Sequence, residues 1–448
     1  MADLKQLARR IFYETLAAID IPLTMQRKLV CEGSLLRSDT AAIDLSHFKK
    51  VRMVAIGKAA HAMLDGLQAI LPRDFSFAGI AAAPIAPATP QPGVQYFIGG
   101  HPIPNEDSWN AAKAILEMLS ACDNQTLVFF LLSGGGSALV ELPLDPLINL
   151  ADMQQIHRVL IGCGAPIEAI NTVRKHISAV KGGRLATAAS SATKITLAVS
   201  DVPAGKEWAL ASGPTLPDPT TLSDMKDVLD KYALRDKFPE AFHRWVARGA
   251  LPETPKAGDP AFKNAHFSIL LGLDNLFHPA HGAAEGAGCI TCCDNATDDW
   301  PVERAAEYLL AQLEELRGIN PSRYVAVIAD GEVSSPITGN GIGGRNAAFV
   351  LSCVEKIAGK NIAVLSAGTD GIDGNSPAAG AVADGETLAR AHAAHLDPRD
   401  AFKRSDAYTF FNQLDDAIII GPTGNNLRDF RVLVAAPDTE SSSTETEA

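Results

Sequence analysis

An apolar run and a glycine-rich turn meet in LVFFLLSGGGSA, which extends from Leu127 to Ala138. The apolar part is typical of a buried strand, and the helix-like residues after it make the glycines a strand-to-helix turn. Glycines allow the backbone to adopt positive φ and to approach a ligand closely. The free N–H groups and the positive end of the helix dipole then favour an anion at this turn.

A second turn of this kind, GIGGRN, extends from Gly341 to Asn346 and opens the helix-like run Ala347–Leu351. Two such turns in one chain predict a phosphorylated ligand. The residues predicted to bind the nucleotide or its phosphates at these turns are Ser133, Gly134, Gly135, Gly136, Ser137, Gly343 and Gly344.

The first turn departs from two well-known templates. Leu139 stands where a dinucleotide fingerprint needs a third small residue. Ser137 is followed by Ala138 and Leu139, so the Gly-x-Ser-x-Gly pattern of a nucleophile elbow is absent. The turn is therefore predicted to be a general nest for phosphate or carboxylate, and a tight structural turn is the alternative.

The composition is that of an acidic globular protein. The 448 residues exceed one ordinary core, so two domains, or three, are expected. Hydrophobic residues make up 47% of the chain and charged residues 20%, which excludes a disordered class. The net charge of −13 argues against nucleic acid and against an anionic membrane as partners. Nothing in the composition indicates an oligomeric state.

The N-terminal segment and the cysteines predict a cytoplasmic protein. No apolar run approaches the ~20 residues that span a bilayer. Apolar residues between Met1 and Ile21 recur at helical spacing among charged residues, which predicts an amphipathic surface helix instead of a signal peptide. The seven cysteines are expected to be reduced core thiols. The alternative is a zinc site formed by His278, His281, Cys289 and Cys292.

Short β-branched runs alternate with helical patterns, which predicts an α/β fold with mainly parallel sheets. The expected domains are residues 1–250 and 262–437, followed by a disordered acidic tail at 438–448. A linker rich in proline and glycine is expected at 251–259, and a surface loop at 81–93. The expected strands are 52–56, 126–132, 195–200, 267–271, 324–328, 362–366 and 417–420.

Lys58 directly follows the end of the expected strand 52–56, apart from one glycine. This is a position where ligands bind, because open α/β sheets bind their ligands at the carboxyl ends of strands. In the first turn of a helix a lysine opposes the dipole, at a cost of about 0.3–1 kcal/mol. A bound anion accounts for this lysine, and a solvated side chain is the alternative. The turn is not a Walker A loop, because the upstream glycine is missing and Ala59 replaces the Ser or Thr that would hold magnesium.

Basic residues cluster between Asn171 and Arg184 in an otherwise acidic chain. Helical spacing places Arg174, Ser178 and Lys181 on one face. We expect Arg174 to bind the substrate and Lys181 to contact the nucleotide phosphates. Compensation of the dipole at a helix C-terminus is the alternative.

Carboxylates also follow expected strands. Asp201 is predicted to bind Mg²⁺, which prefers one or two carboxylates together with phosphate oxygens and water. Asp370 and Asp373 are predicted to contact the substrate, and one of them to accept a hydroxyl proton; ordinary Asp-Gly turns are the alternative. Arg345, directly after Gly344, is expected to bridge two oxygens of a transferring phosphoryl group.

Taken in order, these motifs resemble those of the class II glycerate kinases, whose C-terminal half is called MOFRL. Members of this family phosphorylate D-glycerate at the 2-hydroxyl with ATP, and some carry the older name hydroxypyruvate reductase. The resemblance covers nearly the whole chain and rests on IGKAA at 56–60, GHPIP at 100–104, SGGGSA at 133–138, residues 171–183, SDVP at 200–203, ASGPT at 211–215, GGRN at 343–346, AGTDGIDG at 367–374 and GPTG at 421–424.

The resemblance implies two Rossmann-like domains with the active site in the cleft between them. It also implies a need for Mg²⁺, with Lys58 and Arg345 as the catalytic pair. Two segments depart from the family pattern. Residues 375–378 read NSPA, so an expected carboxylate is missing, and Asn425-Asn426 replaces Thr-Asn close to an unusual Arg428. These departures concern the identity of the acid substrate more than the reaction type.

The sequence therefore predicts a kinase that uses ATP and Mg²⁺ to convert D-glycerate into 2-phosphoglycerate and ADP. The alternatives are a kinase of a related small hydroxy acid, an NAD(P)H-dependent hydroxypyruvate reductase, and a non-catalytic anion-binding protein. The missing third glycine of the dinucleotide fingerprint argues against the reductase.

Overall fold

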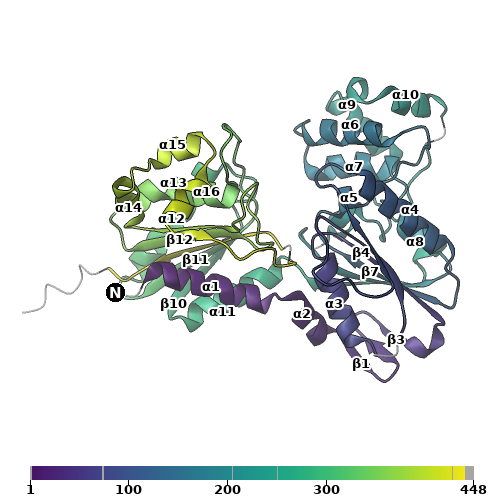
Figure 1. The fold of residues 1–448 in the computed structure, drawn as a ribbon, viewed down its shortest axis with the longest axis horizontal. Coiled ribbons are helices and arrows are strands. Elements are labelled where there is room, and N and C mark those ends of the chain that lie inside the picture. The colour runs from purple at the N-terminus through teal and green to yellow at the C-terminus, as the bar shows by residue number, and fades with distance from the viewer. Residues whose placement is uncertain (1–2, 73–74, 204, 250, 426, 439–448) are drawn as a thin grey trace, which may run out of the picture. The chain divides into compact units, whose positions relative to one another are not determined.

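The computed structural model describes residues 3–72, 75–203, 205–249, 251–425 and 427–438, which fold into two compact units (Figure 1). Unit 1 combines residues 1–20 with residues 273–448, and unit 2 comprises residues 21–272. Each unit is built on a six-stranded sheet with helices. The predicted α/β class is confirmed.

The sheet of unit 2 is entirely parallel, with the strand order β6-β5-β4-β7-β8-β9. Counted along the chain from β4, this is the 3-2-1-4-5-6 order of a doubly wound sheet, whose order reverses between β4 and β7. The strands are β4 (Lys50–Ile56), β5 (Ala78–Ala83), β6 (Val94–Ile98), β7 (Thr126–Leu132), β8 (Thr193–Val199) and β9 (Ala265–Leu271).

Helices cover both faces of this sheet. On one face, α4 (Glu106–Ser120) packs Ile115 and Leu119 against Val54 and Phe130, together with α8 (Arg184–Ala188). On the other face lie α2 (Ile21–Lys28), α3 (Ala60–Ile70) and a small antiparallel sheet. That small sheet contains β1 (Val30–Glu32), β2 (Leu35–Arg37) and β3 (Ala42–Asp44).

Within the described residues, a second apolar cluster of unit 2 contains no strand and lies among helices, in the upper part of the unit in Figure 1. It is formed by α6 (Leu150–Ile161), α7 (Ile167–Ile177), α9 (Leu222–Lys231) and α10 (Glu240–Ala247). The short helix α5 (Gly136–Leu139) and the 3-10 helix η2 (Glu207–Ser212) lie between this cluster and the sheet, and the 3-10 helix η3 (Arg235–Lys237) joins α9 to α10. The helix α7 carries Arg174, but it ends at Ile177 and Ser178 is extended, so Ser178 and Lys181 do not share one helical face with Arg174 as the spacing predicted.

The sheet of unit 1 is mixed, with the strand order β10-β11-β15-β12-β13-β14. Only β10 and β11 pair in parallel: β15 is inserted antiparallel between β11 and β12, and β13 and β14 also pair antiparallel, so the predicted parallel pairing describes the sheet of unit 2 and not this one. The carboxyl ends of β11 and β12 therefore meet the start of β15 at one edge. The strands are β10 (Cys289–Asp294), β11 (Tyr324–Asp330), β12 (Ile362–Gly368), β13 (Gly380–Asp384), β14 (Ala417–Ile418) and β15 (Asp429–Ala435).

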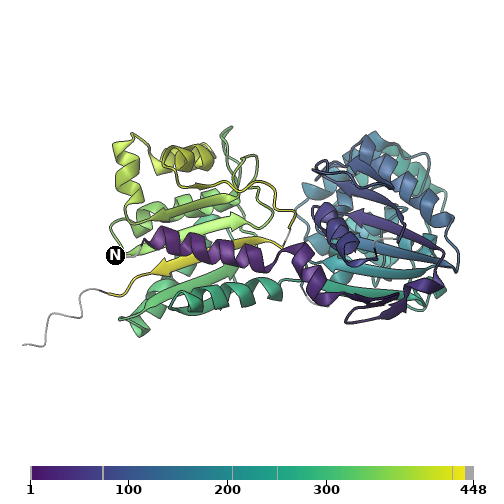
Figure 2. The ribbon, with the colours of Figure 1, turned by 60° about the horizontal axis from the view of Figure 1, so that its bottom comes forward.

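Helix α1 (Leu4–Ala18) lies along the sheet of unit 1, as both ribbon views show (Figures 1 and 2). Its apolar stripe is fully buried at Ile11 and Phe12, and the Phe12 ring stacks on that of Phe430. α11 (Asp274–Gly286) shares this face. The other face carries α12 (Val302–Ile319), α13 (Arg345–Ile357), α14 (Thr387–Ala393), α15 (Pro398–Lys403) and α16 (Ala407–Gln413).

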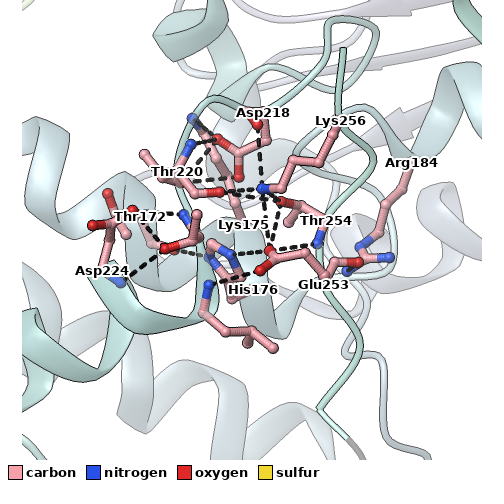
Figure 3. Close-up of polar contacts among 12 residues, drawn as sticks. Thr172, Lys175, His176, Arg184, Asp218, Thr220, Asp224, Glu253, Thr254 and Lys256 are labelled. Atoms are coloured by element: carbon pink, nitrogen blue, oxygen red, sulfur yellow. Dashed lines mark hydrogen bonds and ion pairs between the residues drawn. The ribbon is translucent and has the colours of Figure 1, made fainter. Parts of the chain in front are cut away.

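These units differ from the expected domains at two places. Residues 1–20 were expected with the N-terminal domain, but the stripe of α1 is buried against β12 and β15. The expected linker at 251–259 lies inside unit 2, where Glu253 and Lys256 bond to other segments (Figure 3), and β9 then completes the sheet. Both differences come from contacts between segments distant in sequence. Apart from Asp438, the expected acidic tail lies outside the described residues.

All seven expected strands are present, and the expected loop at 81–93 overlaps the end of β5. The residues of the alternative zinc site lie on α11 and β10. Within the described ranges, no group of three or more His, Cys, Asp or Glu side chains is arranged to hold a metal. Burial raises the pKa of Cys289 to about 11. No helix in the described part of the chain is both long enough and apolar enough to span a membrane.

Candidate active site

The first glycine turn lies where the strand order of unit 2 reverses, at the adjacent carboxyl ends of β4 and β7. Backbone and side-chain bonds join the two strand ends: Lys58 N donates to Gly134 O at 3.0 Å, and Ala59 N donates to Ser133 Oγ at 3.0 Å. A Cβ on Gly57 would lie 2.1 Å from Ser133 Oγ. Ser133 is fully buried, so its hydroxyl holds the Lys58 turn in place.

The remaining glycines of this turn present free N–H groups. No hydrogen bond within the described chain uses the N–H of Gly134, Gly135 or Gly136. Gly135 adopts φ +85°, and a Cβ there would lie 3.4 Å from both Lys58 Cγ and His101 Cδ2. The turn thus combines open donors with a partly exposed lysine stem and an exposed imidazole, which suits an anion.

A chain of polar contacts leads from this turn to Arg174. Ser137 Oγ and Ser212 Oγ are 2.8 Å apart, and Ser212 Oγ donates to Asn171 Oδ1 at 3.1 Å. Arg174 Nη1 approaches the same Asn171 oxygen at 3.5 Å, and Arg174 Nε has no partner within the described residues. The structure thereby brings the predicted Arg174 and Ser137 into one connected group.

Lys181 does not join this group. It is 1% exposed, and its Nζ donates to Glu141 Oε2 at 2.6 Å. The buried Glu141 also accepts from Ser178 and contacts His157. The structure therefore does not support the predicted contact of Lys181 with a nucleotide phosphate, because its side chain is buried inside unit 2 against Glu141.

Asp201 is partly exposed and follows β8, which neighbours β7 in the sheet. Its position at the same carboxyl edge as Lys58 and Gly134 fits a single-carboxylate ligand of Mg²⁺, since phosphate oxygens and water supply the other ligands of such sites. The remaining predicted residues belong to unit 1.

In the second glycine turn, side chains of the protein itself already accept hydrogen bonds from the backbone N–H groups. Gly344 is the N-cap residue of α13. At this helix N-terminus the side chain of Asp373 accepts hydrogen bonds from Asn346 N at 3.0 Å and from Ala347 N at 2.9 Å. The N–H of Gly343 is taken by Asn375 Oδ1 at 2.8 Å. A carboxylate already occupies the position that an anion would take, so the structure does not support the predicted phosphate contacts of Gly343 and Gly344.

Asp373 is 2% exposed, and burial raises its pKa to about 7. The two backbone N–H bonds lower the pKa of this carboxyl only in part, and nearby Asp429 raises it further. Asp370 differs, because it is partly exposed, and its Oδ1 accepts from Ile372 N at 3.0 Å in a tight turn.

Arg345 is held by two carboxylates. Its Nε donates to Asp429 Oδ2 at 2.5 Å, and its Nη1 and Nη2 bond to Glu332 at 2.8 and 2.7 Å. Desolvation opposes the charged form of the guanidinium, but the two carboxylates raise its pKa above its ordinary value. Asp330, at the end of β11, faces the charges of Arg428 and Asp298, and burial raises its pKa to about 6.

The segments that depart from the family pattern have structural partners. Asn375 bridges to Gly341 O at 3.2 Å as well as to Gly343, and Asn425 Nδ2 donates to Ile19 O at 2.8 Å. Arg428 pairs with Asp298 at 2.5 Å. Asn426 lies outside the described residues.

The sequence did not indicate several partners: Glu332 and Asp429 for Arg345, Glu141 for Lys181, and Ser212 for Ser137. Each of these pairs joins segments far apart in the chain, so the residue spacing within one segment does not predict the contact. Ser212 had one available signal, since it lies in the ASGPT motif. Asp429 directly follows Arg428, which the sequence had marked as unusual.

Two family models match this chain. The model described as "Domain of unknown function (DUF4147)" matches residues 7–247, and the MOFRL family model matches residues 325–429. A D-glycerate 2-kinase of Thermotoga maritima is 33% identical over 383 residues, covering 85% of this chain and 89% of the relative. A protein of Agrobacterium vitis, provisionally named hydroxypyruvate reductase, is 34% identical over 387 residues, covering 85% of this chain and 86% of the relative.

The fold has a match among solved structures. The crystal structure of a glycerate kinase from Thermotoga maritima superposes with a TM-score of 0.81 at 30% sequence identity. The match covers 97% of this chain and the full length of that chain (100%).

Proposed function

The chain belongs to the glycerate 2-kinase family whose members combine a DUF4147 domain with a MOFRL domain, and we propose that it transfers phosphate from ATP to the 2-hydroxyl of D-glycerate. The products are 2-phosphoglycerate and ADP. The observation that carries this proposal is the arrangement of Lys58 beside three unused backbone N–H groups where the strand order of unit 2 reverses.

In this proposal the turn from Gly134 to Ser137 holds phosphate groups through its N–H groups, and Lys58 neutralises charge on the transferring phosphoryl group. Phosphoryl transfer needs positioning and charge stabilisation more than an activated nucleophile. The bonds from Lys58 N to Gly134 O and from Ala59 N to Ser133 Oγ support this role, because they fix the lysine against the turn.

We assign Arg345 the same task of stabilising charge on the phosphoryl group. Asp429 and Glu332 hold its guanidinium in one orientation, which lowers the entropic cost of presenting it to an anion. We assign the acceptance of the hydroxyl proton to Asp370 in preference to Asp373. Asp373 is buried, and its carboxylate caps α13.

Mg²⁺ is proposed to bind Asp201 together with phosphate oxygens. The ion would shield the charge of the phosphates during transfer. The support for this assignment is the partial exposure of Asp201 and its position at the carboxyl edge of β8, beside β7.

Reduction of hydroxypyruvate is the competing activity, because relatives carry that name. A dinucleotide fingerprint needs a small residue at the position of Leu139, which is fully buried in the helix after the first glycine turn. The turn therefore departs from the dinucleotide fingerprint, and we favour the kinase.

The test is ATP turnover with D-glycerate and Mg²⁺, coupled to enolase without a phosphoglycerate mutase. We expect a signal through enolase alone, because only 2-phosphoglycerate is its substrate. Release of ADP without an enolase signal would indicate another hydroxyl or another hydroxy acid. Oxidation of NADH by hydroxypyruvate without any ATP turnover would establish the reductase instead.

A further inference from the structure

Arg174 is a buried cation without a full complement of partners. It lies on α7, is 7% exposed, and its Nε has no hydrogen-bond partner within the described residues. Its closest polar contact is the long one from Nη1 to Asn171 Oδ1, at 3.5 Å. A guanidinium removed from water is costly unless an anion and hydrogen bonds compensate it. Arg174 is therefore a candidate binding residue for an anionic ligand.

The charges around Arg174 leave an excess of one positive charge. Glu141 is the carboxylate that acts on Arg174, and its own oxygen is bonded to Lys181 at 2.6 Å. Burial lowers the pKa of His157, so this neighbour is neutral at neutral pH. The buried group thus contains one anion and two cations. It matches a ligand with a single negative charge and not a polyphosphate.

The other basic residues of α7 provide a contrast (Figure 3). Lys175 pairs with Asp218 at 3.1 Å, and His176 contacts Glu253 at 3.0 Å. Lys256 joins the same network through Glu253. Each of these cations pairs with a carboxylate of the chain, and His176 and Lys256 both contact Glu253. Within the described residues, Arg174 on the same helix forms no ion pair with a carboxylate, and its hydrogen bond is the long one to the neutral amide of Asn171.

Arg174 is connected to the phosphate turn. Ser212 Oγ donates its proton to Asn171, so Ser137 must be the donor in the Ser137–Ser212 bond. Ser212 adopts φ +61° and Ala211 φ +49°, which is strained for residues with a Cβ. The strained turn holds Ser212 between Ser137 and Asn171. An acid bound at Arg174 therefore lies close to the turn that holds phosphate.

We propose that Arg174, assisted by Asn171 and Ser212, forms the subsite for the carboxylate of the acceptor, a short hydroxy monocarboxylate. This inference rests on the proposed kinase function. Arg174 is 7% exposed, so in this proposal a small group reaches it and a nucleotide does not, and its positive charge selects acids over uncharged polyols such as glycerol.

The test uses the full chain with Arg174→Met, Arg174→Lys and Asn171→Ala, and the exposed Arg158→Met on α6 as the matched control. We expect Arg174→Met to raise the KM for D-glycerate about 30-fold or more, with the KM for ATP unchanged. Arg174→Lys and Asn171→Ala should raise the same KM by smaller factors. Arg158→Met should leave both constants unchanged.

A second readout needs no turnover. D-glycerate alone should raise the Tm of the wild type and of Arg158→Met, and it should raise that of Arg174→Lys by less at the same concentration, whereas glycerol should raise none. An increased KM for ATP with an unchanged KM for D-glycerate would overturn the subsite. So would an unchanged KM for D-glycerate in Arg174→Lys and Asn171→Ala, even if Arg174→Met fails to fold.

Failure of the kinase proposal gives a different result. In that case the wild type shows no ATP turnover, yet D-glycerate still raises its Tm in a manner that depends on Arg174. If both readouts fail in the wild type while ATP is turned over with another acid, the same variants are tested with that acid in place of D-glycerate. A change in the KM for ATP alone in Arg174→Lys would then overturn the proposed subsite.

Discussion

At the scale of single residues, burial decides what each charged side chain does. Lys58 and Lys181 both lie close to glycines, yet Lys58 is partly exposed beside free N–H groups, and Lys181 is buried against Glu141. Asp370 and Asp373 differ in the same way. Spacing alone could not separate these pairs, because it does not reveal which side chain meets a partner from a distant segment.

Lys58→Ala is expected to lower kcat by a factor of about 10²–10³ while the free energy of unfolding stays close to that of the wild type. The lysine neutralises charge that develops in the transition state, whereas its partly exposed side chain contributes little to packing. Steady-state kinetics and urea denaturation measure the two effects. Near-normal kcat in this variant would exclude the proposed role.

Asp373 should make the stability of unit 1 depend on pH. Its native pKa of about 7 exceeds the ordinary value of 3.8, so the native state binds the proton more tightly than the unfolded state. The wild type should therefore lose stability relative to Asp373→Asn as pH rises from about 4 to about 7, by at most about 1.4 kcal/mol per pH unit.

Urea denaturation of both proteins at several pH values measures this difference, which should become constant above pH 7. A wild-type advantage that grows with pH would show instead that the two backbone N–H bonds favour the ionised carboxylate.

At the scale of elements, the two glycine turns differ in whether side chains of the protein bond their backbone N–H groups. The turn after β7 leaves its N–H groups unused, whereas the turn before α13 is capped by Asp373 and Asn375. Both have the glycines that a strand-to-helix turn needs. The difference arises because the segment around Asp373 folds back onto α13, which no pattern within GIGGRN predicts.

Gly135→Ala should lower activity more than stability. The new Cβ would meet Lys58 Cγ and His101 at 3.4 Å, and φ of +85° adds about 1–2 kcal/mol of strain. Gly164→Ala is the matched control, since Gly164 has φ +73° and nothing within 4 Å of the added Cβ. Urea denaturation should give similar losses for both variants, and only Gly135→Ala should lower kcat/KM. Equal kcat/KM values would contradict a functional role of the turn.

Glu141→Gln should destabilise unit 2 by about 3–5 kcal/mol, because it leaves the charge of Lys181 buried without a counterion. The double variant Glu141→Gln/Lys181→Met should recover part of this loss. Denaturation of the two single variants and the double variant gives the coupling free energy. Additive losses would show that the pair is not coupled.

At the scale of the whole molecule, the chain does not divide at its linker-like segment. Its first helix belongs to unit 1, although nearly the whole chain separates α1 from β15. Lys5 of α1 bonds to Asp416 at 2.8 Å, and Ile11 and Phe12 are fully buried on the sheet. An amphipathic pattern predicts the helix but not the sheet that covers it.

Deletion of residues 1–20 should loosen unit 1 and leave unit 2 protected, because it uncovers the face of β12 and β15. Hydrogen–deuterium exchange of the full chain and the truncated chain measures this by segment. Faster exchange is expected in β12 and β15 and unchanged exchange in β4 and β7. Loss of protection in β4 and β7 would contradict the assignment of α1 to unit 1.

The sequence by itself determined the α/β class, the seven strands it indicated and the turn at Gly134–Gly136, because strand runs and glycine turns are local patterns. Motif order also identified the family. Only the tertiary structure decided that β15 enters its sheet antiparallel, that Asp373 closes the second turn and that Lys181 is neutralised. These outcomes depend on which distant segments pack together. The residue spacing within any one segment does not determine the free energy of that packing.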